Sequence, residues 1–220
     1  MIKKIIYGII ALIILGCIAW GPIVSYMVEQ PKYTIIDLND GINHDDIEIR
    51  EYAPMIIAEV SVSGERSQAI GQGFRKIADY IFGNNSLNKD VAMTAPVIQQ
   101  EGTEIAMTAP VIQQQNNIED SWKVRFVMPS KYTMESLPKP INKEIKLIEI
   151  PAKRFAVIGF SGRASEEDLL KQTKRLQAYM GSKNLKAIAK PQYAFFNPPW
   201  TLSFLRHNEV MIELEGKNAK

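Results

Sequence analysis

The sequence predicts an α+β domain with two helices packed on one twisted antiparallel sheet, preceded by an N-terminal transmembrane helix. Residues 47–67 match residues 145–165 without a gap, at an offset of 98. Apolar residues alternate with period two along both stretches, as in half-buried strands, and a helix signal follows each. A charge-free apolar run at residues 5–28 stands ahead of both.

The offset aligns chemically similar residues. Ala58 corresponds to Ala156, and Ser63-Gly64 corresponds to Ser161-Gly162. A strand ending at Ser-Gly therefore opens each half, and we predict a pseudo-twofold repeat of strand–helix–strand–strand halves. Chance similarity between two amphipathic units is the alternative, and the matching Ser-Gly ends weigh against it.

The first helix is expected at residues 66–82. Its apolar residues fall at helical spacing on one face: Ile70, Phe74, Ile77, Ala78 and Ile81. Gly71 and Gly73 lower its intrinsic helix propensity, so packing must stabilise it.

The second helix is expected at residues 165–180. Ser165 suits an N-cap, and the acidic residues 166–168 suit the positive end of the helix dipole. Gly181 is expected to end the helix. The residues predicted to face inward are Leu169, Thr173, Leu176 and Met180.

The remaining strands are expected at residues 91–98, 105–113, 122–128, 187–196 and 210–214. Residues 91–100 and 105–114 are copies that differ only at Val91 and Ile105. The segment between them suits a turn, which makes a hairpin plausible. Pro96 and Pro110 each lack a backbone donor, which places them at an edge or a bulge.

The N-terminal run is read as an uncleaved membrane anchor. Its 24 residues would span about 36 Å as a helix, at ~1.5 Å per residue. Lys3 and Lys4 precede it, which predicts a cytoplasmic N-terminus and a periplasmic or extracellular domain. Cleavage as a signal peptide and lipidation at Cys17 are the alternatives. The predicted division is an anchor at 1–28, a linker at 29–46 and a ligand-binding domain at 47–215.

Charge and cysteine content exclude several classes of function. Apart from Lys3 and Lys4, the chain carries 24 basic and 24 acidic residues. A neutral domain offers no basic face, so no nucleic-acid partner is expected. Cys17 is the single cysteine, so neither a disulfide nor a thiolate metal cluster can form within the chain.

Several motifs together resemble the SOUL haem-binding protein family. They are residues 47–52 with Pro54, residues 69–80, Met93-Thr94-Ala95-Pro96-Val97, residues 126–129, residues 197–200 and residues 206–210. The resemblance covers about residues 46–215. It implies a twisted antiparallel sheet flanked by two helices as a pseudo-twofold repeat, and it implies binding of haem or a related tetrapyrrole.

The resemblance also implies a haem groove beside the first helix. There Ile70, Phe74 and Ile77 would contact the ring, and Arg75 and Lys76 would lie near the propionates. The alternative is that the apolar stripe belongs to the core and the cations are solvated.

The known ligand positions of the family are not kept in this chain. Basic residues proposed to meet the propionates in one branch align with Gly71, Asp79 and Thr201, and an axial histidine of another branch aligns with Glu51. Any haem must therefore use other groups.

Two histidines are weak candidates for iron ligands. His44 lies in a polar loop and His207 precedes the last predicted strand. A lone loop histidine is more commonly a solvated side chain.

The expected function is a non-catalytic, membrane-tethered haem or tetrapyrrole binder. One alternative is a module that binds another amphipathic small molecule, because the doubled strand–helix plan also resembles the effector-binding domains of some bacterial transcription regulators. A hydrolase using a carboxylate such as Glu51 or Glu149 is the least favoured reading, because no catalytic constellation is visible in the sequence.

Overall fold

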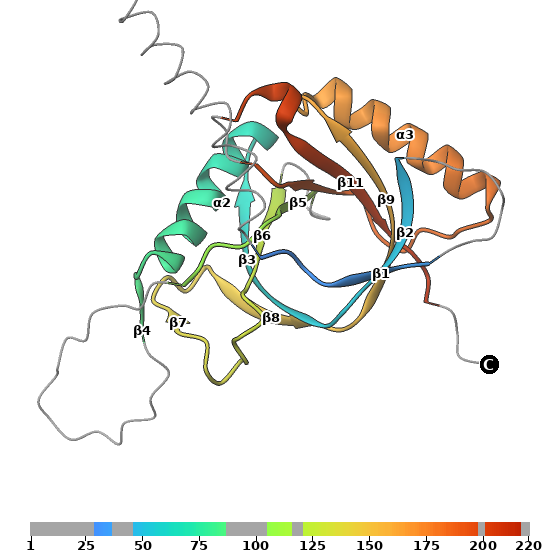
Figure 1. The fold of residues 1–220 in the computed structure, drawn as a ribbon. Helices are drawn as coiled ribbons and strands as arrows, with labels where there is room; N and C mark the ends of the chain where they lie inside the picture. Colours follow the sequence, from blue (N-terminus) through green and yellow to red (C-terminus); the bar gives the residue numbers. More distant parts are fainter. Residues whose placement is uncertain (1–28, 37–45, 87–104, 116–120, 198–200, 217–220) are drawn as a thin grey trace, which may run out of the picture.

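The computed structural model describes residues 29–36, 46–86, 105–115, 121–197 and 201–216. They form an α+β fold in which a nine-stranded antiparallel sheet curls around its own inner face (Figure 1). The leading strand and the first half are β1 (Tyr33–Ile35), β2 (Ile47–Tyr52), β3 (Met55–Ser63), α2 (Arg66–Ile81), β4 (Asn85–Ser86), β5 (Val111–Gln115) and β6 (Ser121–Val127). The second half contains β7 (Lys139–Pro140), β8 (Lys146–Ile150), β9 (Lys153–Ser161), α3 (Glu166–Ser182), β10 (Gln192–Phe195), the 3-10 turn η1 (Ser203–Leu205) and β11 (His207–Glu213).

The two halves are joined by an exchange of strands. The sheet order is β1-β2-β9-β11-β10-β5-β6-β3-β8, while β4 and β7 form a separate pair. The first strand of each half therefore pairs with the other half, because β2 lies beside β9 and β8 lies beside β3. The halves also meet at the centre of the sheet, where β5 pairs with β10.

The register of these exchanged strands confirms the repeat. Tyr52 lies opposite Lys153, and Ile150 lies opposite Met55. At the offset of 98, Ile150 corresponds to Tyr52 and Lys153 corresponds to Met55. The two ladders are thus copies of one another, which is the pseudo-twofold relationship expected from the sequence.

The prediction of one continuous strand at the start of each half is wrong. Each is broken into two strands, at Ala53-Pro54 in the first half and at Pro151-Ala152 in the second. Proline lacks the backbone N–H that a central ladder needs, so pairing ends there and the chain crosses to the other half. The phase of the period-two alternation changes at the break: Ile49 before it faces outward, whereas Ile57 after it faces inward.

The strand predicted at residues 105–113 is also corrected. Residues 105–110 are irregular, the Ala109-Pro110 bond is cis, and strand β5 begins only at Val111. The Thr108 hydroxyl donates a hydrogen bond to the Val127 carbonyl, which holds this segment against the end of β6. The first copy of the repeated segment lies outside the described residues, and the predicted hairpin with it.

Both predicted helices are present. Ser165 caps α3 as expected, and the four residues predicted to face inward are the ones the helix buries. The expected stop at Gly181 is wrong, because α3 continues to Ser182. Lys183 is its C-cap, and Asn184 follows with a φ of 53°, the left-handed conformation that terminates helices.

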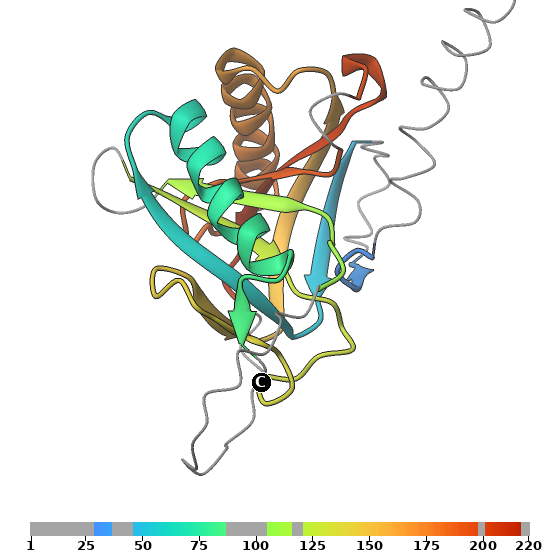
Figure 2. The same ribbon diagram turned by 90° about the vertical axis from the view of Figure 1, so that its left-hand side faces the viewer.

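The helices share the outer face of the sheet. Helix α2 packs over β3 and β6, and α3 packs over β9 and β11 (Figure 1, Figure 2). Each helix forms its own apolar cluster with the strands beneath it, centred on Ile77 for α2 and on Leu176 for α3. A third cluster contains no helix residue and occupies the inner face: Tyr52, Ile57, Ile112, Val127, Phe155, Val157, Ala194 and Met211.

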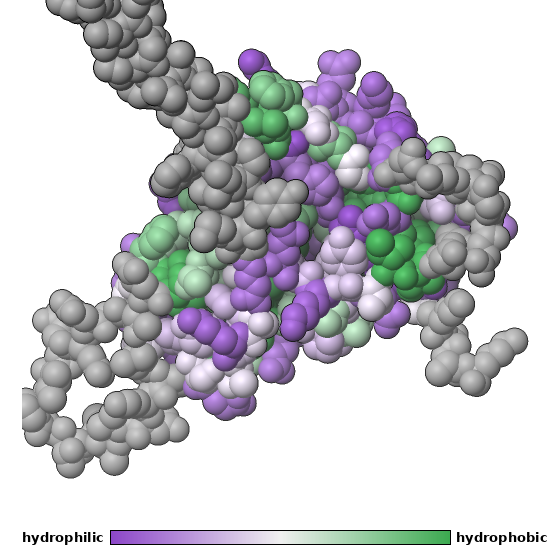
Figure 3. Space-filling view, in the orientation of Figure 1, coloured by the Kyte–Doolittle hydropathy of each residue, from purple (hydrophilic) through white to green (hydrophobic). Residues whose placement is uncertain are grey.

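The segment predicted as a linker contributes to the fold. Strand β1 pairs with β2 and extends the sheet at one edge. Among the described residues, no helix has the length and apolarity needed to cross a bilayer. The predicted anchor and Cys17 fall outside those residues. Polar residues dominate the visible described surface, and apolar ones gather in separate patches (Figure 3).

Candidate functional site

A large cavity opens where the two halves exchange strands. Its volume is about 590 Å³, within the range of roughly 300–1,000 Å³ common for small-molecule sites. The turn after β2, the end of β6 and the end of β8 form its walls, together with residues 29–32. The proline breaks that divide the predicted strands therefore shape this cavity.

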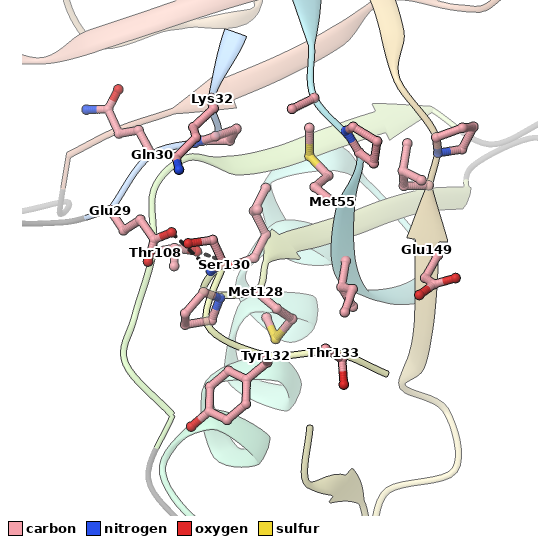
Figure 4. A pocket seen from close by; sticks show the side chains of 18 residues that line it. Glu29, Gln30, Lys32, Met55, Thr108, Met128, Ser130, Tyr132, Thr133 and Glu149 are labelled. Atoms are coloured by element: carbon pink, nitrogen blue, oxygen red, sulfur yellow. Dashed lines mark hydrogen bonds between the residues drawn. The ribbon is translucent and has the colours of Figure 1, made fainter. Parts of the chain in front are cut away.

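The lining of the large cavity combines soft apolar groups with a few charges. Met55 at the start of β3 and Met128 after β6 present thioethers, and Tyr132 adds an aromatic ring (Figure 4). Lys32 and Glu149 lie on different sides of the hollow in this view. A mostly apolar lining with a few charged groups is typical of small-molecule sites.

The segment just after the predicted anchor closes one side of the cavity. The Glu29 carboxylate accepts a hydrogen bond from the Ser130 backbone N–H at 3.0 Å. The Glu29 carbonyl accepts from Ala109, and the Lys32 carbonyl accepts from Ala53. Hydrogen bonds from Ser130 lower the pKa of Glu29, against a smaller opposing effect of burial.

A buried ion-pair network lies on the inner face beside this segment. Arg50 on β2 donates from Nη1 to Oε1 of Glu209 on β11 at 2.9 Å, and from Nε to Glu48 at 2.6 Å. Burial by itself lowers the pKa of the Arg50 guanidinium. The Glu209 charge and the hydrogen bonds to Tyr52 and Glu48 raise it more, so the net shift is upward.

A small cavity adjoins this network. Its volume is about 190 Å³, and Tyr33, Tyr52, Phe196 and His207 line it with Arg50 and Glu209. His207 Nε2 lies 2.9 Å from Glu209 Oε1. Gln30 and Pro31 line both cavities, so the segment at 29–32 stands between them.

The residues predicted beside the first helix do not converge on either cavity. Ile77 is fully buried in the core, and Phe74 packs on Phe126 with ring centroids 5.3 Å apart. Ile70 is half-buried and Arg75 is exposed. Lys76 forms an ion pair with Glu144 at 2.8 Å.

The other predicted candidates are dispersed. His44 lies outside the described residues, whereas His207 contacts Glu209. Glu149 lines the large cavity, but Glu51 is an exposed residue that lines neither cavity. Within the described ranges, no group of three or more His, Cys, Asp or Glu side chains could hold a metal ion.

Sequence reasoning missed Arg50, Glu209 and the two methionines of the large cavity. A signal for Arg50 existed, since it shares the face of Tyr52 in a strand whose other face carries Ile47 and Ile49. Glu209 gives a weaker signal, between Asn208 and a run of apolar residues. No local pattern shows that Met55 and Met128 face the same space, because that depends on strand exchange.

Comparison with known proteins identifies the domain. The family model described as SOUL heme-binding protein matches residues 28–104 and 99–213. These two segments include all of the described sheet and both helices. No curated protein matches the chain.

Solved structures share the fold at low sequence identity. A hydrolase from Listeria innocua superposes with a TM-score of 0.50 at 9% identity, covering 80% of this chain and 94% of that one. The C-terminal domain of EcmrR superposes with a TM-score of 0.52 at 12% identity, covering 77% of this chain and 96% of that one. An uncharacterized conserved protein from Listeria innocua superposes with a TM-score of 0.50 at 13% identity, covering 77% of this chain and 92% of that one. These likenesses show the fold alone.

Proposed function

The chain belongs to the SOUL heme-binding protein family, and from this we propose that it binds haem or a related tetrapyrrole without catalysing a reaction. The family match over residues 28–104 and 99–213 is the observation that carries the proposal. The large cavity is the first location that we propose for the ring, and its volume of about 590 Å³, adequate for a cofactor, supports this.

The residues present around the large cavity fit a haem group. Met55, Met128 and Tyr132 supply the thioether and phenol groups that serve as axial ligands in haem proteins. Lys32 supplies a cation for a propionate. Val127, Ile150 and the prolines at 31, 54 and 151 provide apolar contact for the ring.

The outer surface of α2 is the second location that we propose for the ring. There Ile70 and Phe74 are half-buried and Arg75 is exposed, so all three are open to a ligand on the outer face. Ile77 would contribute only through the core, because it is fully buried. Substitutions in the large cavity and substitutions on α2 should therefore affect haem binding differently, and this difference distinguishes the two locations.

We further propose that residues 5–28 tether the domain to a membrane, with the N-terminus cytoplasmic and the domain periplasmic or extracellular. The charge-free run and the Lys3-Lys4 pair support this. Since residues 29–32 line the large cavity, the tether would hold the cavity close to the bilayer. Alkaline extraction of membranes from cells expressing the full chain tests it. Release of the chain into the soluble fraction would contradict the tether.

A haemin titration of the full-length chain tests the cofactor and its location. We expect a saturable Soret band, weakened or shifted by Met55→Leu or Met128→Leu, which remove sulfur while nearly conserving volume. Met180→Leu is the matched control, because that methionine is a buried residue of α3, in the other half and away from both cavities. The paired change Ile70→Gln and Arg75→Gln probes the α2 location. Absence of a saturable band in the wild-type chain would refute haem binding.

A module for another amphipathic molecule is the second candidate function. The mixed lining of the large cavity, with Lys32 and Glu149 among apolar groups, supports it. Dyes or cationic drugs that displace haem would favour this reading. A hydrolase is less supported, since Glu51 and Glu149 do not share a cavity. Glu149→Gln and Glu51→Gln provide the controls for an activity screen.

A further inference from the structure

One oxygen of the buried Glu209 carboxylate is unused. Its side chain is 2% exposed, and among the described residues Oε2 has no hydrogen-bond partner. Oε1, by contrast, takes both the Arg50 guanidinium and the His207 ring at 2.9 Å. A carboxylate left half-satisfied in the interior costs free energy, so a donor at Oε2 would be favourable.

The charges around this oxygen favour a cation. Arg50 forms ion pairs with two carboxylates, those of Glu209 and Glu48. Arg50, Glu48 and Glu209 together carry one negative charge. The neighbouring charges on the same face of β9 and β11, Lys153 and Glu213, neutralise each other at 2.7 Å. One positive charge in the small cavity would therefore balance the network.

The walls of the small cavity suit an organic cation of limited size. Tyr33 and Tyr52 have ring centroids 5.2 Å apart, and Phe196 and the His207 ring are paired at 4.7 Å. The Arg50 guanidinium already lies over the Tyr33 ring, 4.3 Å from its centroid, which leaves Tyr52 and Phe196 for a ligand. Aromatic faces attract cations electrostatically. The volume of about 190 Å³ equals on the order of six water molecules, which excludes a tetrapyrrole.

We propose that the small cavity binds a small protonated amine or amidine, whose positive charge pairs with the Glu209 carboxylate and whose apolar part lies among Tyr33, Tyr52 and Phe196. This site is separate from the large cavity and does not depend on haem binding. It shares only Gln30 and Pro31 with that cavity.

Isothermal titration of the full-length chain in a mild detergent with benzylamine tests the site. At pH 8 an ordinary histidine is neutral and the amine is still protonated. We expect saturable binding of benzylamine and much weaker binding of benzyl alcohol, its uncharged counterpart. Glu209→Gln should weaken benzylamine binding about tenfold or more, since it removes the negative charge that pairs with the ammonium group.

Matched variants separate this effect from a general change in the fold. Glu213→Gln removes a carboxylate from the same strand and face but outside the cavity, and should leave binding unchanged. Glu48→Gln should weaken binding by removing the excess negative charge, and it decides the question if Glu209→Gln does not fold. Equal affinities for amine and alcohol, or full amine affinity in either the Glu209 or the Glu48 variant, would overturn the proposal. A failed haem titration would leave this site unaffected.

Discussion

Arg50 and Glu209 form an ion pair across the inner face of the sheet, 159 residues apart in the chain. Their side chains are 9% and 2% exposed, and the Nη1–Oε1 distance is 2.9 Å. β9 lies between their strands, since β2 and β11 both pair with it. The pair therefore ties the first strand of one half to the last strand of the other.

Breaking this pair should strongly destabilise the domain. Arg50→Met leaves the Glu209 charge buried without its main partner, which costs about 3–5 kcal/mol in comparable buried pairs. Urea denaturation followed by circular dichroism measures the loss. Arg175→Met is the control, because its pair with Asp46 is exposed and should contribute only about 0–1 kcal/mol. Equal losses in the two variants would contradict a special role for the buried pair.

Two glycines of α2 should respond to alanine in opposite directions. A Cβ at Gly73 would lie 2.6 Å from Cγ2 of Val124, so Gly73→Ala should destabilise by about 1–3 kcal/mol. A Cβ at Gly71 would meet only the end of the Arg75 side chain at 3.5 Å. Gly71→Ala should stabilise by up to about 1 kcal/mol through helix propensity. Thermal unfolding checks the signs, and adding Val124→Ala to Gly73→Ala should recover part of the loss.

The two halves differ in how their helices begin. In α3 the Ser165 hydroxyl accepts from the Asp168 N–H at 3.2 Å and the Asp168 carboxylate accepts from the Ser165 N–H, whereas Glu65 makes no capping bond to α2. Ser165→Ala should therefore cost about 1 kcal/mol. Ser67→Ala, at the corresponding position of the first half, should change stability by less than about 0.5 kcal/mol. Equal costs in chemical denaturation would show that the cap contributes nothing specific.

Glu29 should make the domain sensitive to acid. Hydrogen bonds from Ser130 lower its pKa in the folded state. A depressed carboxyl pKa adds stability that is complete above the unfolded value, near 4.5, and is lost as the pH falls through the folded value. Melting temperatures of wild type and Glu29→Gln should therefore differ most at neutral pH and converge on acidification. Parallel curves from pH 7 to pH 3 would contradict this contribution.

The elements that local pattern controls were predicted well. The inward residues of α3, its Ser165 cap and the matching of the two halves at an offset of 98 all follow from periodicity and end signals within short windows. The break at Ala53-Pro54 was not predicted, although the outward-facing apolar residues change there from odd positions such as Ile49 to even positions such as Ala58. The end of α3 was missed because Asn184, rather than Gly181, adopts the left-handed conformation.

The candidate site was only partly predictable. The resemblance gave the ligand class, and the outer stripe of α2 gave one location for it. The two described cavities lie elsewhere, around residues 29–32 and the crossings between β2 and β3. A single strand cannot show which distant segment will cover its inner face, so Met55, Met128 and Glu209 appeared as ordinary strand or loop residues.

The sequence by itself determined that this protein is a doubled α+β domain of one haem-binding family, because repeats, motifs and amphipathic periods are properties of contiguous residues. Only the tertiary structure decided that the halves exchange their first strands and that Arg50 meets Glu209. It also decided that the segment at 29–32 stands between two cavities. These features depend on contacts between residues far apart in the chain. The free energy of those contacts is gained only when the strands of both halves pair in one sheet.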